Sequence, residues 1–163
     1  MKGLGETGIS YTLPAAPGVY ALVLRLPSAQ PVRVGSLGEF TFCAGAYVYV
    51  GSALGGLAAR VGRHLQGPRK ARWHIDYLAR AAPIAAVIFA ETTGRLECSL
   101  AALLAGRLEA AVPGFGASDC GCFTHLYFAA QEGLARAAAR ESFVILGLGP
   151  REAVVAGRPA RGY

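Results

Sequence analysis

A tyrosine, an arginine and a histidine can meet at one corner of this chain, within the stretch YVYVGSALGGLAARVGRHL at residues 47–65. The β-branched and aromatic residues predict a strand that ends at a glycine, after which Ser52 caps a helix. Arg60 and His64 lie four residues apart, on the border of the apolar stripe of that helix, and can lean over Tyr49. A phenol, a guanidinium and an imidazole together suit phosphate chemistry, and packing alone does not require them.

A carboxylate is predicted to point into the apolar face of a later helix. This helix is expected over residues 95–111, and Glu97 shares a face with its leucines. Leaving such a carboxylate unpaired costs several kcal/mol, so it needs a cation, either a metal ion or Arg60. The alternative is that Glu97 only complements the helix dipole in the first turn, which is worth roughly 0.3–1 kcal/mol. The inward direction favours the metal ion.

These residues form part of an ordered set that resembles the signature of the GIY-YIG nuclease superfamily: Gly18-Val19-Tyr20, Tyr49-Val50-Gly51, Arg60, His64 and Glu97. Family members carry a tyrosine in each short motif, an arginine and then a histidine or tyrosine on the next helix, and a later glutamate that holds a divalent metal. The connection between Tyr20 and Tyr49 is longer than is typical. It resembles that of a standalone subfamily with a long insertion, which also has Trp-His-Ile-Asp, Glu-Cys and Ser-Asp-Cys segments like those here. The likeness covers residues 18–127.

The resemblance implies a divalent-metal-dependent endonuclease that hydrolyses nucleic-acid phosphodiester bonds, with DNA favoured over RNA. Glu97 would hold one Mg²⁺ or Mn²⁺, Arg60 would bind phosphoryl oxygens, and Tyr20 would orient the water or the metal-bound shell. Tyr49, or less readily His64, would take the proton of the attacking water. Because a free phenol has a pKa of about 10, this role requires Arg60 and the metal ion to lower the pKa of Tyr49.

Basic residues are concentrated near this corner. The chain has a net charge of +6, and no acidic residue occurs between Glu39 and Asp76. The cations expected to contact phosphates there are Arg63, Arg69, Lys70 and Arg72. A patch of one sign attracts polyanions, although an arginine-rich chain also places such residues on an ordinary solvated surface. Two further function classes stay open: a non-catalytic DNA-binding module that retains the fold and the basic face, and a protein-interaction domain. A protein partner that supplies specificity is compatible with the nuclease.

Length and composition predict one α+β domain. The 163 residues are 53% hydrophobic, enough for a sizeable core, and we expect a small, mostly antiparallel sheet that holds Tyr20 and Tyr49 side by side, with helices packed against it. Residues 1–17 are expected to be a lead-in, 18–149 the domain, and 150–163 a mobile tail. Strands are predicted over 18–26, 47–50, 84–90, 123–129 and 143–146. Residues 32–34 and 40–42 are predicted to form a hairpin that lengthens the sheet. Further helices are predicted over 54–65, 72–82 and 132–140. No membrane segment or secretion signal is recognisable, so a cytoplasmic protein with reduced cysteines is expected.

A loop at residues 113–122 and the strand after it contain possible zinc ligands, namely Asp119, Cys120, Cys122 and His125. Only one residue separates the two cysteines, whereas structural zinc sites usually pair cysteines across two to four residues. A fourth ligand would have to be Asp119 or, from far along the chain, Cys43 or Cys98. The spacing therefore favours a packed turn with small cysteines inside.

The predicted helix over 72–82 has an apolar face that includes Trp73 and His74. A histidine on such a face is usually a core group with a satisfied hydrogen bond, so a structural role is expected for His74. Asp76 and Arg80, four residues apart on the opposite side, are expected to pair in solvent.

Overall fold

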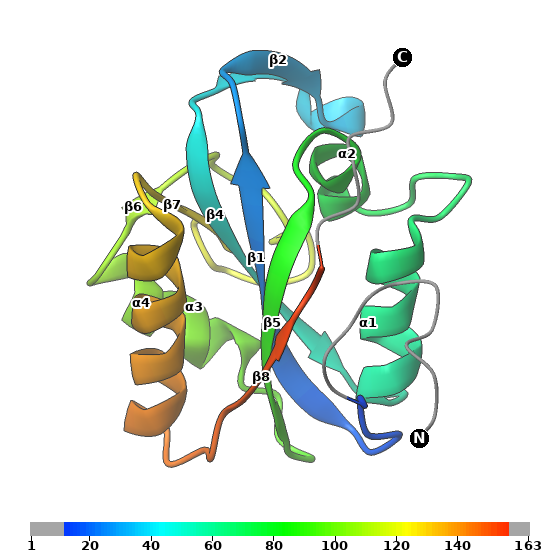
Figure 1. Ribbon diagram of the computed structural model, residues 1–163, viewed down its shortest axis with the longest axis vertical. Helices are drawn as coiled ribbons and strands as arrows, with labels where there is room; N and C mark the ends of the chain where they lie inside the picture. The colour runs from blue at the N-terminus through cyan, green and yellow to red at the C-terminus, as the bar shows by residue number, and fades with distance from the viewer. Residues whose placement is uncertain (1–11, 157–163) are drawn as a thin grey trace.

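One strand lies at the centre of the sheet and pairs on both edges. β1 (Gly18–Leu26) is antiparallel to β4 (Gly45–Ala53) on one side and to β5 (Ile84–Glu91) on the other. The computed structural model describes residues 12–156. The order of the strands in its six-stranded sheet is β6-β7-β4-β1-β5-β8 (Figure 1). The three strands not yet named are β6 at Glu109–Ala110, β7 at Leu126–Ala129 and β8 at Arg151–Val154. All these pairings are antiparallel. The predicted α+β class with a small antiparallel sheet is confirmed.

Helices cover both faces of this sheet (Figure 1). α1 (Leu57–Gln66) and α2 (His74–Ala81) share a core with one face, and α3 (Glu97–Ala105) and α4 (Glu132–Ile145) share a core with the other. Successive strand residues point to opposite faces, so β1 contributes alternately to the two cores. This double burial explains why its sequence is apolar on both sides.

The hairpin is separate from the main sheet. β2 (Gln30–Arg33) and β3 (Glu39–Phe42) pair with each other and are joined by a short 3-10 helix, Gly35–Leu37. The predicted hairpin is therefore confirmed, but the expectation that it lengthens the sheet is wrong. The strands that flank it in sequence, β1 and β4, already have a neighbour on each edge, so neither offers it a free edge.

Three local expectations are wrong. Ser52 belongs to β4 and does not cap α1, whose N-cap is Gly56. The helix predicted over 95–111 begins at Glu97 and ends at Ala105, after which the chain enters β6. Residues 143–145, predicted as a strand, form the last turn of α4, in which Ala135, Ala139 and Phe143 are buried at helical spacing.

The segment expected to be a mobile tail contains an edge strand. β8 pairs with β5 and buries Ala153, and its Arg151 forms an ion pair of 2.7 Å with Glu91. Glu152 pairs with Arg136 and Arg140 of α4, which fastens the strand from its other side. The rest of the predicted tail and most of the predicted lead-in lie outside the described residues. In the part of the chain that the structure describes, no helix combines the length and the apolarity that a membrane span needs.

Candidate active site

Tyr20 and His64 form a buried pair on the face of the sheet that α1 and α2 cover. Tyr20 Oη is hydrogen-bonded to His64 Nε2 at 2.7 Å, and both side chains are almost fully buried. Gly51 on β4 is the register partner of Tyr20, and a Cβ at Gly51 would lie 2.4 Å from Tyr20 Oη. The glycine of the second short motif therefore makes room for the tyrosine of the first, which is a packing reason for the two motifs to occur together.

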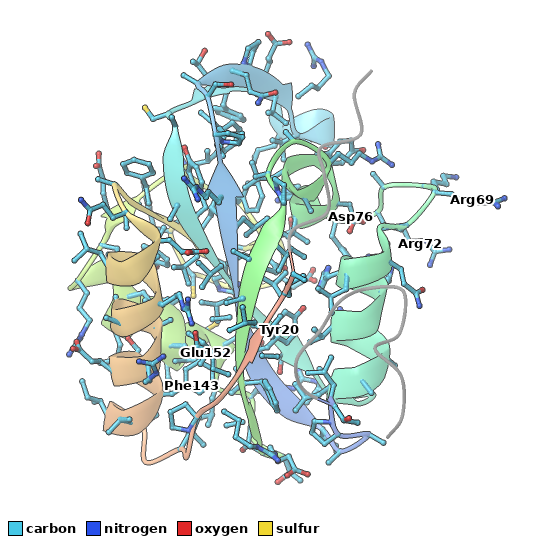
Figure 2. The ribbon with its side chains drawn as sticks, in the orientation of Figure 1. Tyr20, Arg69, Arg72, Asp76, Phe143 and Glu152 are labelled. Carbon is cyan, nitrogen blue, oxygen red and sulfur yellow. The ribbon has the colours of Figure 1, made fainter. Side chains whose placement is uncertain are left out.

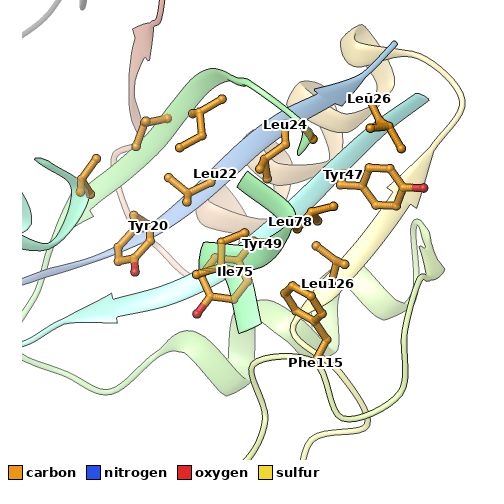
Figure 3. Packing of buried hydrophobic residues seen from close by; sticks show 14 of the residues in the cluster. Tyr20, Leu22, Leu24, Leu26, Tyr47, Tyr49, Ile75, Leu78, Phe115 and Leu126 are labelled. Carbon is orange, nitrogen blue, oxygen red and sulfur yellow. The ribbon is translucent and has the colours of Figure 1, made fainter. Parts of the chain in front are cut away.

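Tyr49 projects from the same face of the sheet, opposite Leu22 of β1 (Figure 3). Its ring centroid lies 6.2 Å from that of His64 and 6.1 Å from that of Phe115, both in edge-on geometry. His64 thus contacts both phenol rings. The structure brings together the Tyr20, Tyr49 and His64 side chains that the sequence placed at one corner.

Burial governs the protonation of this cluster. It raises the pKa of Tyr49 to about 12 and the pKa of Tyr20 well above its ordinary value, while Arg60 offsets part of each shift. It lowers the pKa of His64 to about 4. At neutral pH both phenols therefore keep their protons and the imidazole is neutral. Arg60 alone does not give Tyr49 the low pKa that a general base needs, because burial outweighs the guanidinium.

Trp73 fixes two arginines of α1. Arg60 Cζ lies 4.3 Å and Arg63 Cζ 4.0 Å from the centroid of the indole ring, within the range of a cation–π contact. The ring of Trp73 is also 6.1 Å from the ring of His64. Trp73 therefore holds the Arg60 guanidinium beside the phenols. The sequence predicts only a packing role for Trp73. Its contact with two arginines could have been inferred from its position directly before α2, next to an arginine-bearing helix.

Arg63 and Asp76 form a bidentate ion pair that fastens α1 to α2. Both N–O distances are 2.9 Å, and the buried Asp76 also accepts the backbone N–H groups of Arg72 and Trp73 at 2.8 and 3.0 Å. Burial alone would raise the pKa of Asp76, but these hydrogen bonds outweigh it and the pKa is lowered. The predicted Asp76–Arg80 pair is wrong. Arg63, expected to bind phosphates, has its guanidinium committed to Asp76 and Trp73.

The remaining predicted phosphate contacts are exposed. Arg69, Lys70 and Arg72 lie in the connection between α1 and α2. Figure 2 shows Arg69 and Arg72 directed away from the body of the protein. They form a charged rim on the side of the sheet that carries Tyr20, Tyr49 and Arg60, as a polyanion surface requires.

Glu97 begins α3 and has an unpaired carboxylate oxygen. Its Oε2 is buried without a hydrogen-bond partner, and no ion pair joins it to a cation among the described residues. The alternative that Arg60 neutralises it is therefore not observed. After burial, which has the largest effect on the pKa of Tyr49, the charge of Glu97 is one of the smaller contributions that raise it. An orphaned buried carboxylate oxygen fits a ligand of a divalent cation.

The loop after β6 is held against Tyr49. Gly116 donates its backbone N–H to His74 Nδ1 at 2.8 Å, and it has a φ of 68°. A Cβ there would lie 2.8 Å from the Tyr49 ring, so glycine is required both by conformation and by contact. His74 thus has the structural role expected for it, as the acceptor that positions this loop.

The same loop brings its cysteines to α3. The ligand atoms of Cys98, Cys120, Cys122 and His125 all lie within 4.8 Å of one another. Cys98, the residue after Glu97 and one of the three residues left open as a fourth ligand, lies in this group, so the four side chains could hold a metal ion. Cys43 is exposed and Asp119 is not part of the group. Sequence spacing alone could not show this, since the fourth ligand comes from a different element.

Comparison with known proteins gives one match. The model of a family described as "Domain of unknown function DUF123" matches residues 19–147, which is most of the chain and includes the whole candidate site. No curated protein and no solved structure matches.

Proposed function

The chain belongs to the DUF123 family, and we propose that it is a divalent-metal-dependent endonuclease that hydrolyses nucleic-acid phosphodiester bonds, with DNA favoured. The observation that carries this proposal is the orphaned, buried Oε2 of Glu97, whose charge acts on Tyr49. The ordered resemblance to GIY-YIG nucleases supports it. Arg60 supplies the cation that a phosphoryl group needs at the same corner.

The chain's own residues have separable tasks in this mechanism. Arg60, held against Trp73, binds the non-bridging phosphoryl oxygens as charge develops. Glu97 would hold one Mg²⁺ or Mn²⁺, which when bound relieves charge on the leaving oxygen and adds to Arg60 in favouring the Tyr49 phenolate. Tyr49, more exposed at 9% than Tyr20 at 1%, is the phenol that reaches the water and takes its proton.

Tyr20 and His64 act behind Tyr49. Tyr20 is too deeply buried to orient a water directly, so its hydrogen bond fixes the imidazole ring of His64. That ring packs edge-on against Tyr49 and sets the direction of the phenol. The pair therefore positions Tyr49, and its neutral state avoids a second positive charge in the core.

Arg69, Lys70 and Arg72 support the second candidate, a DNA-binding module without cleavage, because their exposed rim does not depend on the buried cluster. Both candidates share the polyanion surface and differ only at Glu97 and Arg60. We place the protein in the cytoplasm, since the closely packed thiols of Cys98, Cys120 and Cys122 suit a reducing compartment. A protein partner that supplies specificity fits either candidate.

Cleavage assays with a matched glutamate pair test the proposal. Full-length protein is incubated with supercoiled plasmid and with flap and junction oligonucleotides, in Mg²⁺ or Mn²⁺. Glu97→Gln should abolish nicking, whereas Glu109→Gln, an exposed glutamate on β6, should cleave like the unmodified protein. DNA binding with no cleavage by either protein would select the binding module. Neither binding nor cleavage would exclude both candidates and leave the interaction domain.

A further inference from the structure

We propose that Cys98, Cys120, Cys122 and His125 form a closed tetrahedral zinc site that fastens the loop at residues 113–125 to α3. Glu97 is not one of the four ligands, and the proposal does not depend on the proposed nuclease activity. It uses three sulfur atoms and one nitrogen, a ligand set found in structural zinc sites. Nothing in the proposed hydrolysis requires these residues, yet they converge from two distant parts of the chain.

The spacing of the ligand atoms matches a tetrahedral ion. Zn–S bonds of about 2.3 Å and Zn–N bonds of about 2.0–2.1 Å at tetrahedral angles place sulfur and nitrogen about 3.6 Å apart and two sulfurs about 3.8 Å apart. Cys120 Sγ lies 3.5 Å and Cys98 Sγ 3.9 Å from His125 Nε2. All four ligand atoms lie within 4.8 Å of one another. An ion at their centre requires only small side-chain adjustments.

The backbone around the ligands is fixed by hydrogen bonds that do not involve their side chains. His125 donates its N–H to Phe115 O at 2.8 Å and accepts from Val50 N–H at 3.1 Å, which ties it to the loop and to β4. Cys120 N–H donates to Ala117 O at 3.4 Å within the turn. Cys98 is held in the first turn of α3. The donors are thus presented by an ordered framework, which lowers the entropic cost of binding an ion.

Ligand chemistry selects zinc over the ion proposed for Glu97. Thiolate and imidazole are soft to intermediate ligands and suit Zn²⁺, whereas Mg²⁺ and Mn²⁺ prefer carboxylate and water oxygens. Four protein ligands leave no open position, so this ion has a structural role. A single disulfide would use two of the three thiols and leave the third beside an imidazole with no partner, and it would not explain why His125 Nε2 points into the group.

The site lies directly next to the catalytic corner. Cys98 follows Glu97 in α3, and the loop that carries Cys120 also carries Gly116, which packs on Tyr49. A zinc ion would therefore fix the position of Glu97 relative to Tyr49 from outside the reaction site.

Metal content and a matched cysteine pair provide the test. Full-length protein is produced in zinc-supplemented medium and purified in reductant, without chelator or metal-affinity resin, and its zinc is measured by mass spectrometry of the intact chain and by elemental analysis. We expect about one zinc per chain in the unmodified protein and in Cys43→Ser, whose thiol is exposed and outside the group. Cys120→Ser should lose the ion and melt at a lower temperature.

A second measurement uses the unmodified protein and so does not depend on a variant that folds. After removal of zinc, titration with Co²⁺ should reach saturation at about one equivalent, with the visible absorption of tetrahedral cobalt and the near-ultraviolet charge transfer of thiolate ligands. Zn²⁺ should displace it. Cys120→His, which retains four ligands, should bind cobalt with a weaker thiolate band. No stoichiometric zinc and no thiolate–cobalt band in the unmodified protein would overturn the proposal, as would equal zinc content in Cys120→Ser and Cys43→Ser.

Discussion

Tyr20 Oη and His64 Nε2 are joined by a 2.7 Å hydrogen bond inside the core, although 44 positions separate the two residues in the chain. The bond ties the central strand β1 to the helix α1 at the point where both meet Tyr49. Burial keeps the pair uncharged, because it raises the pKa of the phenol and lowers that of the imidazole. The pair is therefore both a packing contact and a site at which protonation of His64 would destabilise the fold.

Folding stability should fall as the pH drops from about 6.5 towards 4, because His64 resists protonation only in the folded protein. The folded pKa is about 4 and the unfolded value about 6.5, so the unfolded chain binds more protons between them and stability rises with pH. The effect of this one residue is on the order of 3 kcal/mol at most.

Urea unfolding of the unmodified protein and of His64→Gln at about pH 7.5 and about pH 5 measures this difference. The neighbouring charges of Arg60, Arg63 and Asp76 are present in both proteins, as are other histidines whose pKa burial lowers. The variant should be less stable at the higher pH but should lose less stability on acidification. An equal loss in both proteins would contradict the assignment.

Asp76→Asn should destabilise the fold strongly, whereas Arg80→Ala should have little effect. Replacing the buried carboxylate leaves Arg63 without its partner and weakens two backbone hydrogen bonds, a loss of about 3 kcal/mol or more for a buried pair. Arg80 donates an exposed hydrogen bond to Arg69 O and lies 5.9 Å from the centroid of the Tyr77 ring, and surface changes of this kind are usually within about 0.5 kcal/mol. Denaturant midpoints of both variants measure the difference. Similar losses of stability in the two variants would contradict the Asp76–Arg63 assignment and favour the Asp76–Arg80 pair predicted from helical spacing.

Arg60 and Lys70 should affect different steps of DNA cleavage. Arg60→Ala should lower the single-turnover rate about 10²-fold or more with little change in affinity, as expected for a contact made in the transition state. Lys70→Ala should weaken binding and reduce its salt dependence, because Lys70 is exposed on the rim and, in the proposed function, would contact phosphates only to position them. Stopped-flow or quench measurements at saturating enzyme separate the two. If both variants change rate and affinity alike, Arg60 is only part of the rim.

Gly51→Ala should disrupt the site, while Gly62→Ala should stabilise the protein. A Cβ at Gly51 would overlap the Tyr20 ring at 2.4 Å, and overpacking of this kind costs about 1–3 kcal/mol and displaces the phenol from His64. A Cβ at Gly62, inside α1, would meet nothing within 4 Å, and alanine is favoured over glycine in a helix by about 0.5–1 kcal/mol. The melting temperatures of the two variants should therefore move in opposite directions, and only Gly51→Ala should lower the nicking rate.

The parts of the fold that obey local periodicity were predictable from the sequence. β1, β4, β5 and the helical stripe of α1 follow the spacing of apolar residues, and a period of two then places Tyr20 and Tyr49 on one face of neighbouring strands. The full length of α4 could also have been predicted, because the helical spacing of Ala135, Ala139 and Phe143 continues through the segment predicted as a strand.

The features that sequence reasoning missed depend on contacts between separate elements. Helical spacing predicts Arg80 as the ion-pair partner of Asp76, but the observed partner, Arg63, lies on another helix. Likewise, Cys98 joins the later cysteines only because the loop folds back onto α3. β8 is short and carries charges that pair with Glu91 and α4, so its pattern resembles a solvated segment.

The central position of β1 sets an order in which the protein can form during its synthesis. Both strands that pair with β1 emerge from the ribosome after it, β4 first and β5 later. Once residues 18–66 have emerged, the nascent chain already holds both tyrosines, Arg60 and His64, but one edge of β1 stays open until residue 91 has emerged as well. Exposed strand edges recruit other chains. The growing chain therefore passes through an interval in which the cluster of Tyr20, Tyr49 and His64 is complete but its central strand is vulnerable to aggregation, and pairing with β5 ends that interval.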